Sequence, residues 1–165
     1  MWKFHPERPQ DYPDDLMLYR NETPIQSIID QSDLTKDITD ESIRFIEENK
    51  DNQFFLYIAH PQPHVPLFAS KDFNGSTGNG LFADVISEID FSVGRVIEAL
   101  EKNNLTENTI VVFTSDNGPW LSYGDHAGSS GIYREGKGTA WEGGQRVPCI
   151  ITVSYTHLTL PTMMS

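Results

Sequence analysis

The sequence is short of cysteine and has no long apolar run. Cys149 is the single cysteine among the 165 residues, so no disulfide bond can form within the chain. The apolar neighbours Val147 to Ile151 are typical of the entry to a strand, and they predict that Cys149 is a buried structural thiol. No stretch of about 18 apolar residues occurs, so the sequence predicts no membrane-spanning helix.

Basic residues are also scarce. Twelve Lys and Arg residues stand against 24 Asp and Glu residues, which gives a net charge of −12. This balance argues against nucleic acid as a partner. It does not exclude a small anionic substrate, because a site can be locally positive in an acidic protein. The length and the apolar content of 38% suffice for one domain with its own core.

A carboxylate and a carboxamide follow the most continuous apolar stretch of the chain. Residues Thr109 to Thr114 are rich in β-branched and aromatic side chains and predict a strand buried on both faces. Asp116 and Asn117 come directly after it, before Gly118-Pro119 ends the strand. Ligands bind at this end of strands in open α/β sheets, and the side-chain oxygens suit Ca²⁺ or Mg²⁺. The same residues form ordinary turns, so a plain turn stays open as the alternative.

A second apolar run, Gln53 to Ala59, predicts another buried strand. His60 and His64 lie in the proline-rich loop that follows it, where the prolines impose an extended course. Between the two strands, apolar residues at helical spacing predict a helix over Leu81 to Lys102. A strand–helix–strand unit of this kind has parallel strands, so His64 is expected at the same edge of the sheet as Asp116.

The remaining segments give weaker patterns. Residues 1–36 show no sustained period and are interpreted as surface loops. A helix is expected to start near Thr39, which can serve as its N-cap. Residues 70–80 are interpreted as a polar, glycine-rich loop, and Val147 to Val153 as a short third strand.

A long glycine-rich loop is expected from Leu121 to Gly144, and it carries His126, Arg134 and Lys137. Its glycines would let the backbone approach a ligand closely, and its cations would suit an anion. A solvated flexible loop explains the same composition equally well.

Several short motifs follow one another in a fixed order. They are Phe54-Phe55-Leu56-Tyr57, His64-Val65-Pro66, Thr114-Ser115-Asp116-Asn117-Gly118-Pro119, Gly136-Lys137-Gly138-Thr139, Trp141-Glu142-Gly143-Gly144 and Arg146-Val147-Pro148. Together they resemble the formylglycine-dependent sulfatases of arylsulfatase type, in the alkaline-phosphatase-like superfamily. The resemblance implies an α/β fold, part of an alkaline-phosphatase-like sandwich with a parallel-rich sheet and flanking helices. It also implies that residues 1–153 are the later part of a catalytic domain.

The resemblance further implies a sulfuric ester hydrolase with Ca²⁺ as cofactor and a sulfated small molecule or glycan as substrate. Asp116 and Asn117 would be two of the Ca²⁺ ligands. His64 would contact the sulfate or the leaving-group oxygen and act as an acid, and Lys137 would bind the sulfate ester. His60 and His126 are weaker candidates for substrate contacts, with an ordinary loop histidine as the alternative for each.

The sequence departs from the family where the nucleophile is expected. No Cys-x-Pro-x-Arg motif, from which formylglycine is made, is present. The family also has an Asp-Asp metal pair after its first strand. Asp14-Asp15 is not assigned to that pair, because it follows Tyr12-Pro13 rather than an apolar strand. Ca²⁺ takes about six to eight oxygens, and Asp116 and Asn117 offer two. The chain alone is therefore expected to be inactive, since the covalent step lacks its nucleophile. Residues 154–165 differ from the rest and are interpreted as a non-native tail.

Two other functions stay open. One is hydrolysis of phosphate or phosphonate esters within the same superfamily, and the other is a non-catalytic role in binding calcium or an anion. The family implies a periplasmic or secreted parent protein, which the Asn-x-Ser/Thr sites at Asn21, Asn74 and Asn104 would permit. The sequence gives no indication of oligomeric state.

Overall fold

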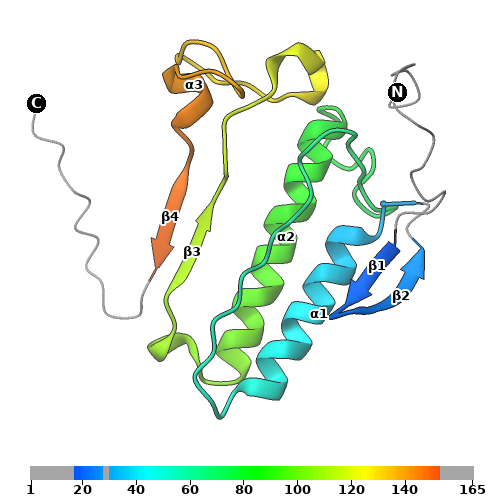
Figure 1. Cartoon of the computed structure of the whole chain (residues 1–165), viewed down its shortest axis with the longest axis vertical. Coiled ribbons are helices and arrows are strands. Elements are labelled where there is room, and N and C mark those ends of the chain that lie inside the picture. The colour runs from blue at the N-terminus through cyan, green and yellow to red at the C-terminus, as the bar shows by residue number, and fades with distance from the viewer. Residues whose placement is uncertain (1–16, 28–29, 153–165) are drawn as a thin grey trace, which may run out of the picture. The chain divides into compact units, whose positions relative to one another are not determined.

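The computed structural model describes residues 17–27 and 30–152 (Figure 1). Contacts divide the chain into two compact units, with the boundary between Gln31 and Ser32. The segment 154–165, interpreted above as a non-native tail, lies outside the described residues.

The first unit contains a β-hairpin. Strand β1 (Met17–Arg20) pairs antiparallel with strand β2 (Thr23–Ser27), and the register shifts between Leu18 and Tyr19. Asn21 begins the connecting turn with a φ of 54°, a left-handed conformation that asparagine tolerates better than most residues. The interpretation of this region as loop was wrong for both strands, because short strands paired by a tight turn give no long period in the sequence.

The second unit is built on two helices that lie side by side, α1 (Leu34–Asn49) and α2 (Leu81–Lys102) (Figure 1). The predicted helix over Leu81 to Lys102 is confirmed. The predicted start of the first helix near Thr39 was wrong, since α1 begins at Leu34. Thr39 is a buried residue inside the helix, and its hydroxyl donates to the Thr35 carbonyl oxygen at 2.6 Å instead of capping the N-terminus.

One apolar cluster joins both helices to the extended segments that follow them. Ile46 of α1 is buried with Ala99 and Leu100 of α2, and Phe54 and Val111 pack against them. A second cluster combines the loop before α2 with the start of that helix. Its buried members and the partly buried side chains around them are Val65, Leu67, Ala69, Val85, Ile89, Phe73, Leu81, Phe82 and Trp120.

Strand β3 (Val111–Thr114) pairs antiparallel with β4 (Cys149–Thr152). The positions of both strands agree with the prediction, but burial of the first on both faces was wrong: Val112 is 55% exposed and Phe113 40%. Cys149 is also exposed, so the predicted buried thiol was wrong. In the part of the chain that the structure describes, both sheets are two-stranded and antiparallel, and no parallel-rich sheet forms.

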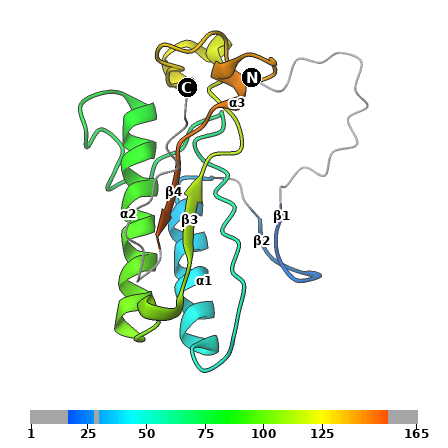
Figure 2. The same ribbon diagram turned by 90° about the vertical axis from the view of Figure 1, so that its left-hand side faces the viewer.

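Residues 53–59 are extended but form no strand, contrary to the prediction. Within the described residues no backbone hydrogen bond joins this segment to another. Phe54 and Leu56 face the helices, whereas Phe55 and Tyr57 are 87% and 78% exposed. Figures 1 and 2 show the segment running beside the helices in the same direction as β3 but apart from it. The side-chain pattern of a strand is therefore present, and the neighbouring strand that would complete it is not.

Short helices lie in the connections on both sides of β3. The 3₁₀ helix η1 (Thr106–Asn108) precedes β3, η2 (Leu121–His126) follows it, and α3 (Glu142–Gln145) leads into β4. In Figure 1, η2 and α3 lie at the end of the unit toward which β3 runs. None of the described helices is long and apolar enough to cross a bilayer.

Candidate active site

Two loops meet at the end of β3. The Gly118 N–H donates to the Gly144 carbonyl oxygen at 3.1 Å, and the Lys137 N–H donates to the Pro119 carbonyl oxygen at 2.8 Å. A Cβ atom added at Gly118 would overlap the carbonyl oxygen of Gly143. Glycine at position 118 thus lets the two backbones approach closely. The two hydrogen bonds place Lys137 beside the segment that follows Asn117.

Trp120 lies between two of the predicted site residues. The Lys137 ammonium nitrogen is 5.3 Å from the centroid of its indole, within the range of a cation–π contact. The imidazole of His64 meets the same indole edge to face, with ring centroids 5.8 Å apart. The expected proximity of His64 to the loop after β3 is therefore observed, although the parallel strand pairing behind that expectation is not.

His64 has one ring nitrogen committed to the backbone. Its Nδ1 lies 2.8 Å from the carbonyl oxygen of Val65. A carbonyl only accepts hydrogen bonds, so Nδ1 must carry the hydrogen. Nε2 is the nitrogen left to exchange a proton with a ligand, and the fixed Nδ1 sets the orientation of the ring.

Asp116 is exposed and Asn117 is half-buried, directly after β3. No described residue donates a hydrogen bond to the Asp116 carboxylate, while the Ser115 hydroxyl donates to the Asn117 carbonyl oxygen at 2.9 Å. The oxygen donors of this pair suit a hard cation such as Ca²⁺. They do not complete a site, because among the described residues no three His, Cys, Asp or Glu side chains come together as a metal cluster.

His60 contacts α2 rather than Trp120. Its Nε2 lies 3.3 Å from the Ser92 hydroxyl oxygen, which is 2.6 Å from the Thr39 hydroxyl oxygen. Because Thr39 donates its hydrogen to Thr35, Ser92 donates to Thr39 and accepts from His60. Burial lowers the pKa of His60 below its ordinary value, and its Nδ1 is buried without a partner.

His126 is exposed at the end of η2. Within the described residues no hydrogen bond or ring contact links it to His64 or Lys137. The structure thus brings His64 and Lys137 together at Trp120, in the loop that also carries Asp116 and Asn117, and leaves His60 and His126 outside that set of contacts.

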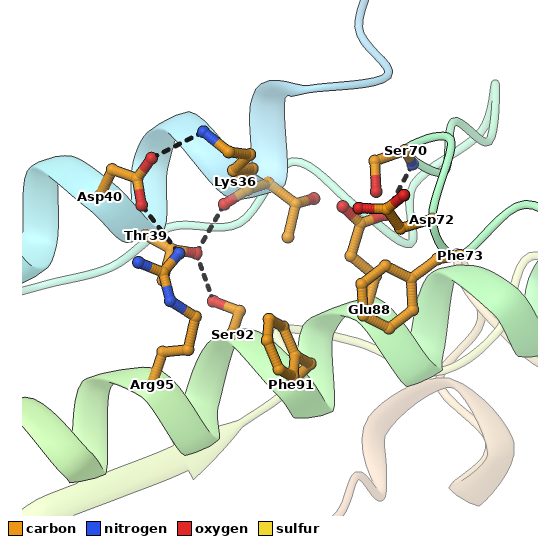
Figure 3. Close-up of a pocket in the computed structure, with 11 residues that line it drawn as sticks. Lys36, Thr39, Asp40, Ser70, Asp72, Phe73, Glu88, Phe91, Ser92 and Arg95 are labelled. Atoms are coloured by element: carbon orange, nitrogen blue, oxygen red, sulfur yellow. Dashed lines mark hydrogen bonds and ion pairs between the residues drawn. The ribbon is translucent and has the colours of Figure 1, made fainter.

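A separate pocket of about 420 Å³ lies between α1, α2 and the loop at residues 70–73 (Figure 3). Arg95 donates to Asp40 at 2.7 Å at one end, and Asp40 also accepts from Lys36 at 2.9 Å. At the other end the buried Glu88 carboxylate accepts the Ser70 N–H at 2.9 Å. None of the predicted site residues lines this pocket, so it is not part of the constellation around Trp120.

Sequence reasoning gave no role to Trp120. Its position directly after Asp116-Asn117-Gly118-Pro119 was the available signal, since an aromatic residue beside candidate ligands is a natural packing partner for them. His64 and Lys137 reach it from two loops that are distant in sequence, and no local pattern reveals such contacts.

The arrangement can bind and protonate an anion. An ammonium group and an imidazole with a free Nε2 contact one aromatic ring, and Asp116 and Asn117 precede that ring in the same loop. A cation stabilises negative charge on an ester, and an imidazolium can donate a proton to a leaving oxygen.

Comparisons with known proteins show the family to which the chain belongs. The model of the family described as Sulfatase matches residues 4–160. The chain is 39% identical over 144 residues to an arylsulfatase of Hemicentrotus pulcherrimus, covering 86% of this chain and 26% of that protein. It is 39% identical over 139 residues to the steryl-sulfatase of Homo sapiens, covering 81% of this chain and 24% of that protein.

The chain is also similar to a solved structure. The crystal structure of Ps i-CgsB in complex with k-i-k-neocarrahexaose is similar, with a TM-score of 0.73 and 33% identity over 85% of this chain and 32% of that one. The chain spans about a quarter of the length of the curated relatives it matches. On the family model and these relatives together, the chain belongs to the sulfatase family.

Proposed function

We propose that the chain is part of a sulfuric ester hydrolase that acts on a sulfated small molecule or glycan. The observation that carries this proposal is the shared contact of Lys137 and His64 with Trp120, next to Asp116 and Asn117. Sulfatase relatives support a sulfate ester as substrate, and the solved complex with a neocarrahexaose supports a glycan. Hydrolysis of phosphate esters has less support, since these relatives are named as sulfatases.

Lys137 and His64 would divide the work on the ester. The Lys137 ammonium binds the non-bridging oxygens and stabilises their negative charge. His64 in its imidazolium form donates the proton on Nε2 to the leaving oxygen as the S–O bond breaks, while Nδ1–H stays on the Val65 carbonyl. This hydrogen bond keeps the ring in one orientation through the step.

Asp116 and Asn117 would hold Ca²⁺ through their side-chain oxygens, together with ligands that this sequence does not supply. When bound, the ion would neutralise charge on the sulfate oxygens. The nucleophile would be a formylglycine from a Cys-x-Pro-x-Arg segment that is also absent from this sequence. The chain alone would therefore be inactive, and we propose export to the periplasm or the exterior for the parent protein.

The test is turnover of p-nitrophenyl sulfate by a sulfatase polypeptide that includes this sequence and a Cys-x-Pro-x-Arg segment. Lys137→Ala should lower turnover by about two orders of magnitude or more, because a charge-stabilising donor is lost. Lys102→Ala is the matched control, since Lys102 is an exposed lysine at the end of α2 that reaches Glu47 at 3.7 Å. Unchanged turnover in Lys137→Ala would reject the role of this lysine, whereas no turnover in the unsubstituted polypeptide would favour a non-catalytic binding protein.

A further inference from the structure

We propose that Trp120 is a positioning residue, whose indole holds the Lys137 ammonium and the His64 imidazole in a fixed relation to each other. This inference rests on the proposed function, because it assigns a task to Trp120 within the same site. Trp120 itself need not touch the reacting atoms.

The indole is well anchored. Trp120 is half-buried and packs against the apolar cluster that contains Val65, Val85 and Ile89. Tyr123 also contacts it edge to face, with ring centroids 4.7 Å apart at an interplanar angle of 66°. A large ring held on several sides has little rotamer freedom, so it can serve as a fixed reference for its neighbours.

His64 is tied to the same reference by two routes. Its ring contacts the indole directly, and its neighbour Val65 is buried in the cluster against which the indole packs. The Nδ1 hydrogen bond to the Val65 carbonyl adds a third restraint. The direction of Nε2 therefore depends on the Trp120 packing.

Lys137 depends on Trp120 more strongly. Its backbone is fixed by the hydrogen bond to Pro119, but its long side chain forms no hydrogen bond or ion pair with any described residue. A lysine side chain has several rotatable bonds and would lose considerable entropy on binding an anion. The cation–π contact with the indole is the interaction that restrains the ammonium before the anion arrives.

The chain supplies a matched control. Trp141 makes the same type of contact with Arg134, whose guanidinium carbon is 3.7 Å from the ring centroid. Trp141 is 48% exposed and has no contact with His64 or Lys137 among the described residues. Replacing Trp141 removes a tryptophan and a cation–π contact without affecting the pair at Trp120.

The experiment is NMR on the full 165-residue chain, with sodium sulfate as the probe. In the wild type, the ring current of Trp120 should shift the Lys137 Hε signals away from those of the exposed Lys102. Trp120→Leu should remove this shift and weaken sulfate binding, followed on the Lys137 and His64 signals, by about two- to fivefold, the range of an exposed cation–π contact. Trp120→Phe should restore part of both effects, and Trp141→Leu should change neither.

The outcomes separate the two proposals. Wild-type sulfate affinity in Trp120→Leu, with the methyl signals of Val85 and Ile89 in place, would overturn the positioning role. So would a wild-type Lys137 without a ring-current shift. If the shift is present and depends on Trp120, but the wild-type chain binds no sulfate, the geometry of the positioning role is supported and the proposed binding of the sulfate ester by Lys137 and His64 is contradicted. Loss of the Val85 and Ile89 signals in Trp120→Leu would leave Trp120→Phe to decide, because a phenyl ring fills the cluster and retains a weaker cation–π face.

Discussion

At the scale of single residues, His60 shows how burial changes the chemistry of a side chain. It donates through Nε2 to Ser92, and its pKa is lowered because burial disfavours the charged imidazolium. The unfolded chain binds this proton near the ordinary pKa of 6.5. As the pH falls below that value, the unfolded state therefore takes up more protons than the folded state, and stability should decrease until the lowered folded pKa is reached.

The measurement is an NMR titration of the His60 Hε1 signal, combined with urea unfolding at pH 7.5 and pH 5.5. We expect a midpoint below 6.5 and a lower free energy of unfolding at the more acidic pH. His60→Gln, which keeps a donor for Ser92 and has no titrating group, should lose a part of this pH dependence. A His60 midpoint at or above 6.5 would contradict the burial argument.

At the scale of elements, helix α2 organises the loop before it through two buried carboxylates one turn apart. Asp84 accepts hydrogen bonds from the Gly75 N–H at 2.9 Å, the Thr77 N–H at 3.0 Å and the Thr77 hydroxyl at 2.6 Å. Glu88 accepts the Ser70 N–H. These bonds lower the pKa of Asp84, first through the Thr77 hydroxyl and then through the two backbone donors.

Asp84→Asn should therefore loosen the loop without unfolding the helix. We expect amide hydrogen exchange at Gly75 and Thr77 to accelerate by about tenfold or more, since a carboxylate accepts more strongly than an amide. Acid should also loosen the loop. The ionised Asp84 carboxylate stabilises the folded state above its ordinary pKa of 3.8, and this stabilisation is lost as the pH falls through the lowered pKa of Asp84 in the folded state. Asp90→Asn, at an exposed position of the same helix, is the control. Equal exchange in both variants would show that Asp84 does not hold the loop.

Elements set by local sequence patterns could be predicted from the sequence, whereas features set by long-range contacts could not. The bounds of α2 followed from apolar residues at helical spacing, which is a local property. The start of α1 was misplaced because Thr39 faces Ser92 across the helix pair, a contact 53 positions away along the chain. The Asp116–Asn117 position and the approach of His64 to that loop could be anticipated from chain order. The role of Trp120 could not, because it depends on packing between three loops.

At the scale of the whole molecule, apolar side chains stand exposed along two extended segments. Phe55 and Tyr57 lie on the unpaired segment 53–59, and Val112 and Ile150 lie on β3 and β4. Unpaired extended backbone with exposed apolar side chains is a surface that favours association, whereas a net charge of −12 opposes it. These exposed side chains predict that the outer face of segment 53–59 takes part in self-association rather than in the core of the chain.

Neighbouring phenylalanines of the 53–59 segment test this view. Phe54 packs on the cluster around Ile46 and meets Phe45 edge to face at 5.6 Å, whereas Phe55 is 87% exposed. Phe54→Ala should lower the free energy of unfolding by about 2 kcal/mol or more, because it leaves a cavity on the helices. Phe55→Ala should change the free energy of unfolding by no more than about 0.5 kcal/mol, as surface substitutions usually do, and should reduce self-association in sedimentation velocity. If Phe55→Ala destabilises the chain as much as Phe54→Ala does, Phe55 is buried in solution, and the outer face of this segment is covered by another polypeptide surface.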